Sequence, residues 1–302
     1  MLTPLVDSYL ALRRACGVKL KCQGSLLRSF AAFSDERAVH RVSSEVAIRW
    51  AGLAPSVSQR AHRLGQVIRF ARYARAEDSS HEVPPPAFGT ERRRRPVPFI
   101  FSQEEIRRLV EAASQSGYRT LRQRTYSTLF ALLACTGLRV SEAIELRYSD
   151  ITPDGLVIRC SKFRKSRLVP LHETAQAGLD RYLKERRPYA PFDDHVFVSL
   201  RRKPLLACHV DVAFRAAAEK IGLRRGPGLP RPTPHCLRHT FAVRALEACP
   251  DGRDRITKHM LALSTYLGHG RVCDTYWYLE STAQLLRDIS ERCERFFRGG
   301  ER

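Results

Sequence analysis

Residues 81–98, HEVPPPAFGTERRRRPVP, contain three consecutive prolines, a glycine and four consecutive arginines. Proline lacks the backbone donor that helices and strands use, so neither element can continue through this segment. A chain of 302 residues is also long for one hydrophobic core, because domains usually hold about 100–200 residues. We therefore predict two domains, residues 1–80 and 99–302, with residues 81–98 as the linker between them.

The chain is strongly basic, with 52 Lys and Arg against 31 Asp and Glu and a formal net charge of +21. This excess favours a polyanionic partner, above all nucleic acid. Both domains share it, since residues 1–98 alone hold 17 Lys and Arg and 8 Asp and Glu. Two basic surfaces that face one ligand are therefore expected. The linker arginines either are simply solvated or cross a DNA backbone; they are Arg92, Arg93, Arg94 and Arg95.

Several classes of protein are excluded by what the sequence lacks. No apolar run approaches the roughly 20 residues that a membrane helix needs, and the N-terminus resembles an amphipathic helix and not a targeting peptide. The nine cysteines form no CxxC pair, so neither a zinc site nor a disulfide framework is expected. The chain also has no GxxxxGK phosphate loop and no carboxylate cluster suited to two metal ions. A cytoplasmic protein without metal or cofactor is predicted.

The pattern of apolar residues and breakers predicts a mainly α fold. The first domain is expected to hold helices at about 3–16, 24–37, 44–52 and 56–77. In the second, Ser102 and Glu105 have the spacing of a capping box, and LVIRC and SRLVPL predict a β-hairpin over 156–160 and 166–171. The remaining elements are predicted as helices at about 121–136, 141–147, 173–187, 208–222, 234–248, 254–266 and 282–297. The fold class is therefore mainly α with a small antiparallel β-sheet in the second domain.

Four separated segments combine the residue types that a phosphate-handling site needs. They are TGLRVSE at 136–142, SKFRKSRLVPL at 161–171, HCLRHTFA at 235–242, and the stretch from LGHG to YWY at 267–278. In this order they resemble the tyrosine recombinase/integrase family, and the resemblance spans about residues 98–280. It implies a two-domain DNA clamp, in which residues 1–80 form the DNA-clamping domain and residues 99–302 the catalytic domain.

Arg139 follows Gly137, which can end the preceding helix and place the arginine on a sharp turn. A guanidinium presents paired donors to phosphate oxygens and stays charged as negative charge builds in a phosphoryl-transfer transition state. The alternative is a surface arginine that pairs with a neighbouring carboxylate such as Glu142. The resemblance implies that Arg139 is catalytic.

His235 and Arg238 are three residues apart in a helix that Thr233 can cap and Pro234 can start, so they share a face in its first turn. A helix N-terminus favours anions, which adds to the attraction of a guanidinium for phosphate. The alternative is a structural His–Arg pair. The match to the HxxR pattern of the family implies that both are catalytic, whereas the adjacent His239 is expected to point elsewhere and to be structural.

The remaining catalytic residues are assigned by the resemblance. Lys162 matches the catalytic lysine, a general acid for the departing 5′ oxygen, and Lys165 an accessory DNA contact. His269 matches a hydrogen-bond donor to a non-bridging oxygen. Tyr278, nine residues later, matches the nucleophile, and Tyr276 is its rival. Because residues two apart on a helix differ in direction by about 200°, only one of these tyrosines can face the site.

The family resemblance implies a site-specific DNA recombinase that forms a 3′-phosphotyrosine intermediate without a metal or a cofactor. It also implies a homotetramer on two DNA duplexes, with accessory DNA-bending proteins as further candidates. A type IB topoisomerase-like activity and a non-catalytic DNA-binding protein are the alternatives. The apolar stripe of the helix at 282–297 can pack on its own domain or on a neighbouring protomer. An enlarged loop at 250–253 favours an enzyme of a mobile element.

Overall fold

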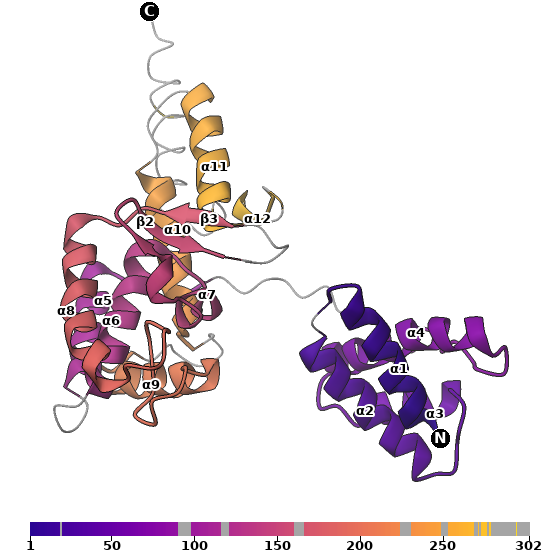
Figure 1. Cartoon of the computed structure of the whole chain (residues 1–302). Coiled ribbons are helices and arrows are strands. Elements are labelled where there is room, and N and C mark those ends of the chain that lie inside the picture. The colour runs from indigo at the N-terminus through magenta and orange to yellow at the C-terminus, as the bar shows by residue number, and fades with distance from the viewer. Residues whose placement is uncertain are drawn as a thin grey trace, which may run out of the picture. The chain divides into compact units, whose positions relative to one another are not determined.

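The computed structural model describes residues 1–18, 20–89, 98–115, 121–159, 166–223, 231–248, 253–268, 271, 273–276, 278 and 294. The chain divides into two compact units, Met1–Arg95 and Pro96–Arg302 (Figure 1). Each unit has its own hydrophobic core. Residues 92–95 and most of the helix predicted over 282–297 lie outside the described residues.

The described part of the first unit consists of four helices whose apolar faces meet in one core. They are α1 (Leu2–Ala15), α2 (Lys21–Asp35), α3 (Ser44–Gly52) and α4 (Val57–Glu77). The Asp35 carboxylate accepts hydrogen bonds from the backbone N of Leu2, at 2.7 Å, and of Thr3, at 3.2 Å. It thereby satisfies free donors at the start of α1. These helices lie within a few residues of the predicted ones.

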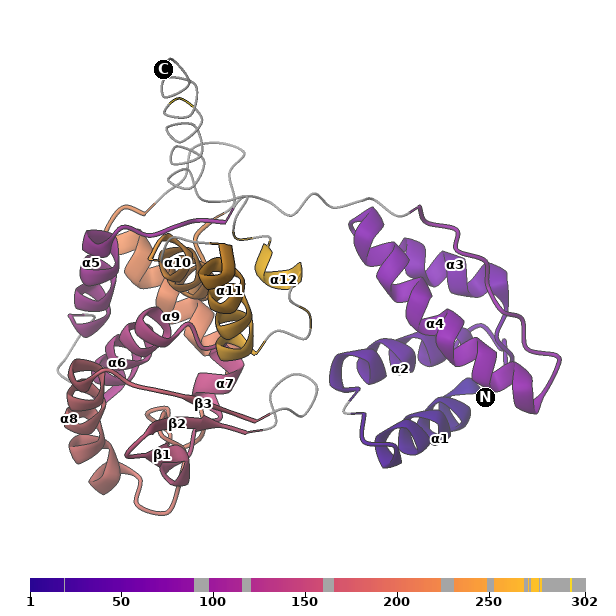
Figure 2. The same cartoon turned by 90° about the horizontal axis from the view of Figure 1, so that it is seen from above.

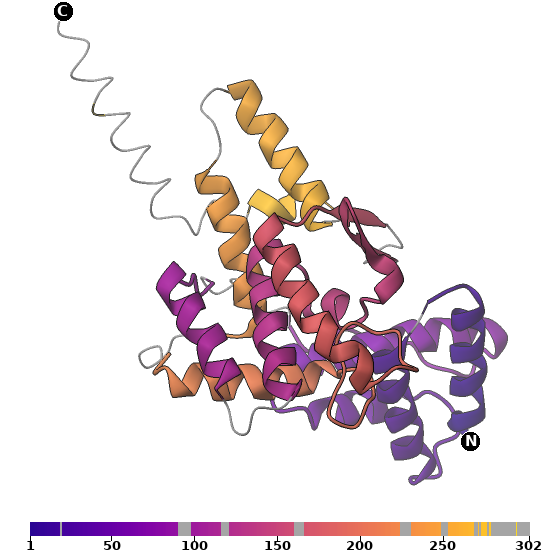
Figure 3. The same cartoon turned by 60° about the vertical axis from the view of Figure 1, so that its left-hand side comes forward.

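The second unit is built around α6, which packs against α5, α8 and α10 (Figures 1 and 3). Its described elements are α5 (Gln103–Ser114), α6 (Leu121–Thr136), α7 (Val140–Ile144), the 3-10 turn η1 (Tyr148–Asp150), β1 (Ile151–Thr152), β2 (Gly155–Ile158), β3 (Arg167–Val169), α8 (Glu173–Tyr189), α9 (Ala207–Lys220), α10 (Pro234–Glu247), α11 (Arg253–Leu267) and α12 (Cys273–Tyr276). The predicted capping box is present, because Ser102 Oγ accepts from Glu105 N at 3.1 Å and the Glu105 carboxylate accepts from Ser102 N at 2.7 Å.

The sheet is antiparallel and its strands follow the order β1-β2-β3 (Figure 2). Leu156 of β2 pairs with Ile151 on one side and with Val169 on the other. Strands β2 and β3 confirm the predicted hairpin, with narrower bounds. Strand β1 is absent from the prediction, because a strand of two residues has no alternating pattern to detect.

The predicted fold class, mainly α with a small antiparallel sheet, is confirmed. Helices α10 and α11 position several of the predicted site residues. Helix α10 packs against both α6 and α11, and α11 also contacts β3. None of the helices in the described part of the chain is long and apolar enough to cross a membrane.

Candidate active site

Gly137 forms the turn between α6 and the start of α7. Its φ is +61°, and a Cβ built there would lie 2.5 Å from Cδ1 of Phe241 on α10. Glycine alone accepts both this backbone angle and this close approach. The turn places Arg139 immediately before α7, as its position after Gly137 predicts, and leaves 22% of the Arg139 side chain exposed.

Three consecutive carbonyl groups at the C-terminal end of α11 each accept a hydrogen bond from a different arginine. The pairs are Arg167 Nε with Tyr266 O at 2.7 Å, Arg238 Nη2 with Leu267 O at 2.7 Å, and Arg139 Nη2 with Gly268 O at 2.9 Å. Carbonyls at a helix C-terminus carry partial negative charge and have no partner within the helix. The end of α11 therefore gathers side chains from β3, α10 and the residue before α7.

Arg238 is the most enclosed of these arginines, with 2% of its surface exposed. Besides its bond to Leu267, it donates from Nη1 to the carbonyl of Gly137 at 2.6 Å. Burial, followed by the charge of nearby Arg139, lowers the pKa of the Arg238 guanidinium to about 10. The group therefore stays charged at neutral pH. Because two backbone carbonyls hold it, its charge needs little reorganisation to act on a substrate.

Glu142 connects two of the arginines through its carboxylate. Oε1 accepts from Arg139 Nη1 at 2.6 Å, and Arg167 donates to Oε1 at 3.1 Å and to Oε2 at 2.7 Å. Burial alone would raise the pKa of Glu142, but hydrogen bonds from the Arg167 side chain and the Arg139 backbone outweigh it and bring this pKa to about 2. The carboxylate is therefore ionised at neutral pH. Glu142, the alternative partner predicted for Arg139, therefore does contact it. Arg167 is the third residue of this ion-pair cluster, and the sequence motifs did not single it out.

Pro234 starts α10 and Thr233 occupies its N-cap position, as predicted. The backbone N of Thr233 donates to Cys236 Sγ at 3.4 Å, and the Thr233 hydroxyl lies 3.5 Å from the same sulfur. Partial burial, followed by the charges of Arg238 and Arg139, lowers the pKa of His235 below its usual range. The His235 imidazole is therefore neutral at neutral pH.

His239 contacts two of the predicted catalytic residues. Its ring centroid lies 4.5 Å from that of His235 and 5.5 Å from that of Tyr278. The expectation that His239 points elsewhere is wrong, because residues four apart on a helix share a face. Tyr278 is 3% exposed and belongs to the apolar cluster between α10 and α11, whereas Tyr276 is 54% exposed. The two tyrosines therefore differ in environment, as their spacing predicts.

The structure brings Arg139, His235, Arg238 and Tyr278 into one region of the second unit. The other predicted site residues lie outside the described residues and stay predictions. They are Lys162, Lys165, His269 and the linker residues Arg92, Arg93, Arg94 and Arg95.

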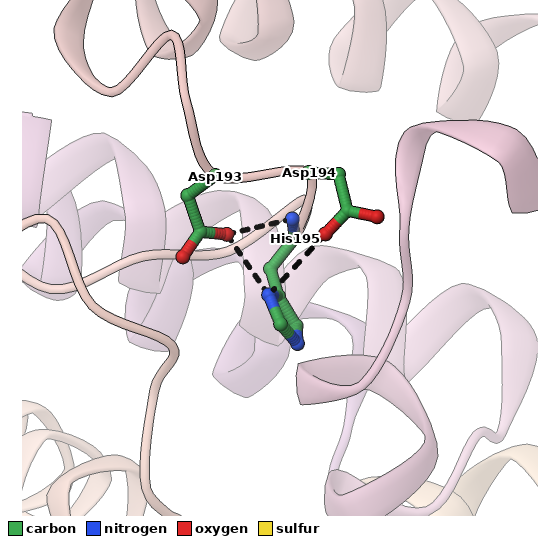
Figure 4. A group of neighbouring side chains, drawn as sticks. All are labelled: Asp193, Asp194 and His195. Carbon is green, nitrogen blue, oxygen red and sulfur yellow. Dashed lines mark hydrogen bonds and ion pairs between the residues drawn. The ribbon is translucent and has the colours of Figure 1, made fainter.

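Among the described residues, Asp193, Asp194 and His195 form the group of side chains close enough to share a metal ion (Figure 4). Several of their polar atoms already have partners within the protein. Asp193 Oδ1 accepts from the backbone N of His195 at 2.8 Å and lies 2.9 Å from its Nδ1, and Asp194 pairs with Arg147 at 2.7 Å. The buried guanidinium of Arg186 lies 3.7 Å from Asp193 and would repel a cation. We interpret the contacts of this group as structural and not as a metal site.

Comparison with known proteins identifies the family to which the chain belongs. The Phage integrase family profile matches residues 100–284. The chain is 37% identical over 302 residues to y4rB, a candidate integrase/recombinase of Sinorhizobium fredii, and the match covers 96% of each chain. It is 32% identical over 217 residues to the tyrosine recombinase XerD of Corynebacterium glutamicum, covering 71% of this chain and 66% of the relative.

Among solved structures, a lambda integrase tetramer bound to a Holliday junction resembles the fold with a TM-score of 0.61 and 19% identity, over 89% of this chain and 77% of the other. The match of the family profile to more than half of the chain, together with the identity to y4rB, is decisive. The chain belongs to the phage integrase family and is a tyrosine recombinase, an enzyme that breaks and rejoins DNA.

Proposed function

We propose that the chain performs site-specific recombination by forming a covalent bond between Tyr278 Oη and a DNA phosphate. The observation that carries this assignment is the position of Tyr278. Its side chain is enclosed, its ring contacts His239, and the Arg238 guanidinium is close enough for the two groups to interact electrostatically. Tyr276 lacks this enclosure. A phenol has an ordinary pKa of about 10, so a nearby positive charge favours the phenolate that must attack.

Arg139 and Arg238 would stabilise the charge that develops on the non-bridging oxygens of the scissile phosphate. Both guanidinium groups are held by backbone carbonyls at fixed positions, which is the arrangement that electrostatic catalysis requires. His235 is neutral at neutral pH because its pKa is lowered, so it can accept the proton of the attacking phenol. By the family resemblance, His269 would donate to the phosphate and Lys162 would protonate the leaving 5′ oxygen.

The proposed reaction is balanced without an external energy source. Tyr278 Oη bonds to phosphorus, the bond to the 5′ oxygen breaks, and the freed 5′ oxygen takes a proton from Lys162. In the second step a 5′ hydroxyl of a partner duplex attacks the 3′-phosphotyrosine and releases Tyr278. One phosphodiester replaces another, so the scheme calls for no nucleotide and no metal cofactor.

Strand exchange between two duplexes requires more than one active site, and we propose a homotetramer that holds both duplexes. The Holliday-junction tetramer of the lambda integrase, which shares the fold, supports this assembly. The first unit would clamp DNA, with Lys165 and the arginines at 92–95 as further contacts. Accessory DNA-bending proteins are candidate partners, and the nucleoid is the expected place of action.

The test is a map of covalent protein–DNA junctions formed on sheared genomic DNA of the source organism, including the DNA that flanks the gene. The wild-type chain should form adducts at one or a few sequences. Tyr278→Phe should abolish the adducts while DNA binding persists, because one hydroxyl is removed without a change of charge. Tyr276→Phe should retain them. Adducts that survive in Tyr278→Phe and disappear in Tyr276→Phe would overturn the assignment of the nucleophile.

Plasmid relaxation and strand transfer, measured beside the adduct map, separate recombination from the alternatives. A type IB topoisomerase-like enzyme would relax supercoiled plasmid irrespective of sequence and would not join strands of two duplexes. A non-catalytic DNA-binding protein would form no adducts at all, even with the wild-type chain. Transfer of a labelled strand to a second duplex carrying the mapped site is the result expected for the proposed function.

A further inference from the structure

Positive charges outnumber negative ones around Glu142, because two guanidinium groups share its single carboxylate. The side chain of Glu142 is 6% exposed, so little water competes for its negative charge. The Arg139 guanidinium donates to one carboxylate oxygen and the Arg139 backbone N donates to the other, whereas the Arg167 guanidinium donates to both. In such an enclosed site an ion pair is screened weakly, so the balance of charges matters more than on a surface.

Each of the three guanidinium nitrogens of Arg167 donates a hydrogen bond within the protein. Nη1 and Nη2 face Glu142, at 3.1 and 2.7 Å, and Nε donates to the carbonyl of Tyr266 at 2.7 Å. Only 8% of its side chain is exposed. A Cβ built on Gly268, where φ is +64°, would lie 2.8 Å from Arg167 Nη1, so the turn after α11 packs directly on this guanidinium. Arg167 therefore offers no free edge to a substrate.

Arg139 differs in this respect. Its guanidinium donates once to Glu142 and once to the carbonyl of Gly268, and 22% of its side chain stays exposed. Taken alone, Arg139 and Glu142 would form a neutral pair with little attraction for a phosphate. With Arg167 included, the three side chains carry a net charge of +1, by counting two guanidinium groups and one carboxylate.

We propose that Arg167 is a positioning residue for recombination: it takes up the charge of Glu142, so that Arg139 keeps a positive charge directed at the scissile phosphate. The bidentate contact suits this role, because a guanidinium matches both oxygens of a carboxylate. The inference rests on the proposed function, in which Arg139 contacts the phosphate. It adds a residue of β3 that does not itself touch DNA.

The charge role predicts a specific coupling between two substitutions. Arg167→Ala should slow formation of the covalent adduct by about tenfold or more at saturating protein, less than the roughly 100- to 1,000-fold loss on removing a donor that touches the transition state. The same substitution in a Glu142→Gln background should cost much less, because no carboxylate remains to neutralise Arg139. Affinity for the mapped DNA site should change little in either background.

A purely structural role gives a different result. If Arg167 only tied β3 to the end of α11 through the Tyr266 carbonyl, Arg167→Ala would cost the same factor with Glu142 or with Gln at that position. Equal losses in the two backgrounds therefore overturn the proposal. Arg107→Ala is the matched control, because Arg107 also makes a bidentate pair, with Glu104, but on the exposed surface of α5. It should leave cleavage unchanged.

A second pair of variants keeps the proposal testable if Arg167→Ala fails to fold. Arg167→Lys retains the charge and loses the planar fork, whereas Arg167→Gln retains a hydrogen-bond donor and loses the charge. The lysine variant should cleave faster than the glutamine variant. Equal rates would show that charge at this position is irrelevant. Absence of Tyr278-dependent adducts with the wild-type chain would instead refute the proposed function itself.

Discussion

Arg238 and Gly137 are 101 residues apart in the sequence, yet Arg238 Nη1 donates a 2.6 Å hydrogen bond to the Gly137 carbonyl. The bond joins α10 to the turn that carries Arg139. Since Arg238 also binds the end of α11, one buried guanidinium joins α10, the turn that carries Arg139 and the end of α11. Changes at any of these contacts should therefore affect the site as a unit.

Gly137→Ala should destabilise the second unit by about 1–3 kcal/mol, the cost of holding a residue with a side chain at positive φ. The added methyl group also meets Phe241 at 2.5 Å. Thermal unfolding of the full chain by calorimetry measures the effect. Gly178→Ala, in the interior of α8 where the nearest atom to a built Cβ is 3.9 Å away, is the control and should be neutral or slightly stabilising. Equal stability of the two variants would contradict the account of the turn.

Arg139→Ala and Arg238→Ala should each slow adduct formation by about 100- to 1,000-fold, because in the proposed mechanism their charges act where negative charge develops. Binding should weaken far less, since affinity for DNA is a sum over many phosphate contacts. Single-turnover cleavage at saturating protein separates the two effects. If saturating protein restores the rate of either variant, that arginine serves docking and not catalysis.

Local patterns predicted most elements of the fold, because caps, breakers and apolar periodicity act within a few residues. The helix at 121–136 and the capping box at Ser102 are examples. The position of His239 could also have been predicted, since the four-residue spacing from His235 places both on one face of α10.

The contacts at the end of α11 could not be predicted in the same way. The bond from Arg139 to Gly268 spans 129 residues and depends on how three elements pack. In the sequence, Arg167 is a polar residue at the start of a predicted strand, and only the structure reveals its buried ion pair with Glu142. One signal was available: an arginine inside an otherwise apolar segment needs a partner when that segment is buried.

Gly65→Ala should stabilise the first unit by about 0.5–1 kcal/mol, because a glycine inside a helix is less favourable than alanine. A Cβ at this position of α4 would meet nothing within 4 Å, so packing within the chain does not require the glycine. The exposed side chains of His62, Arg69 and Arg72 follow the same face at helical spacing. If this face approaches DNA closely, the same substitution should weaken binding to the mapped site. Higher stability with unchanged affinity would place the DNA contact of the first unit elsewhere.

The assignment of Lys162 as general acid rests on the family resemblance, since Lys162 and Lys165 both lie outside the described residues. The chemistry of the leaving group can separate them. If Lys162 protonates the 5′ oxygen as it departs, replacement of that oxygen by sulfur makes the proton largely unnecessary, because a thiolate leaves readily without one. Lys162→Ala should therefore be severely defective on ordinary DNA and close to wild type on a 5′-phosphorothiolate substrate.

Arg139→Ala provides the contrast: in the proposed mechanism the charge of Arg139 acts on the non-bridging oxygens, so the defect should persist on both substrates. Loss of activity alone cannot distinguish a proton donor from a phosphate contact, because both variants are slow on ordinary DNA. Rescue by sulfur can distinguish them, because it removes the need for the proton donor but not for the phosphate contact. The rate of adduct formation on the two substrates is the measurement. If sulfur rescues Lys165→Ala and not Lys162→Ala, the general acid is Lys165, and the match of residues 161–171 to the family pattern is shifted.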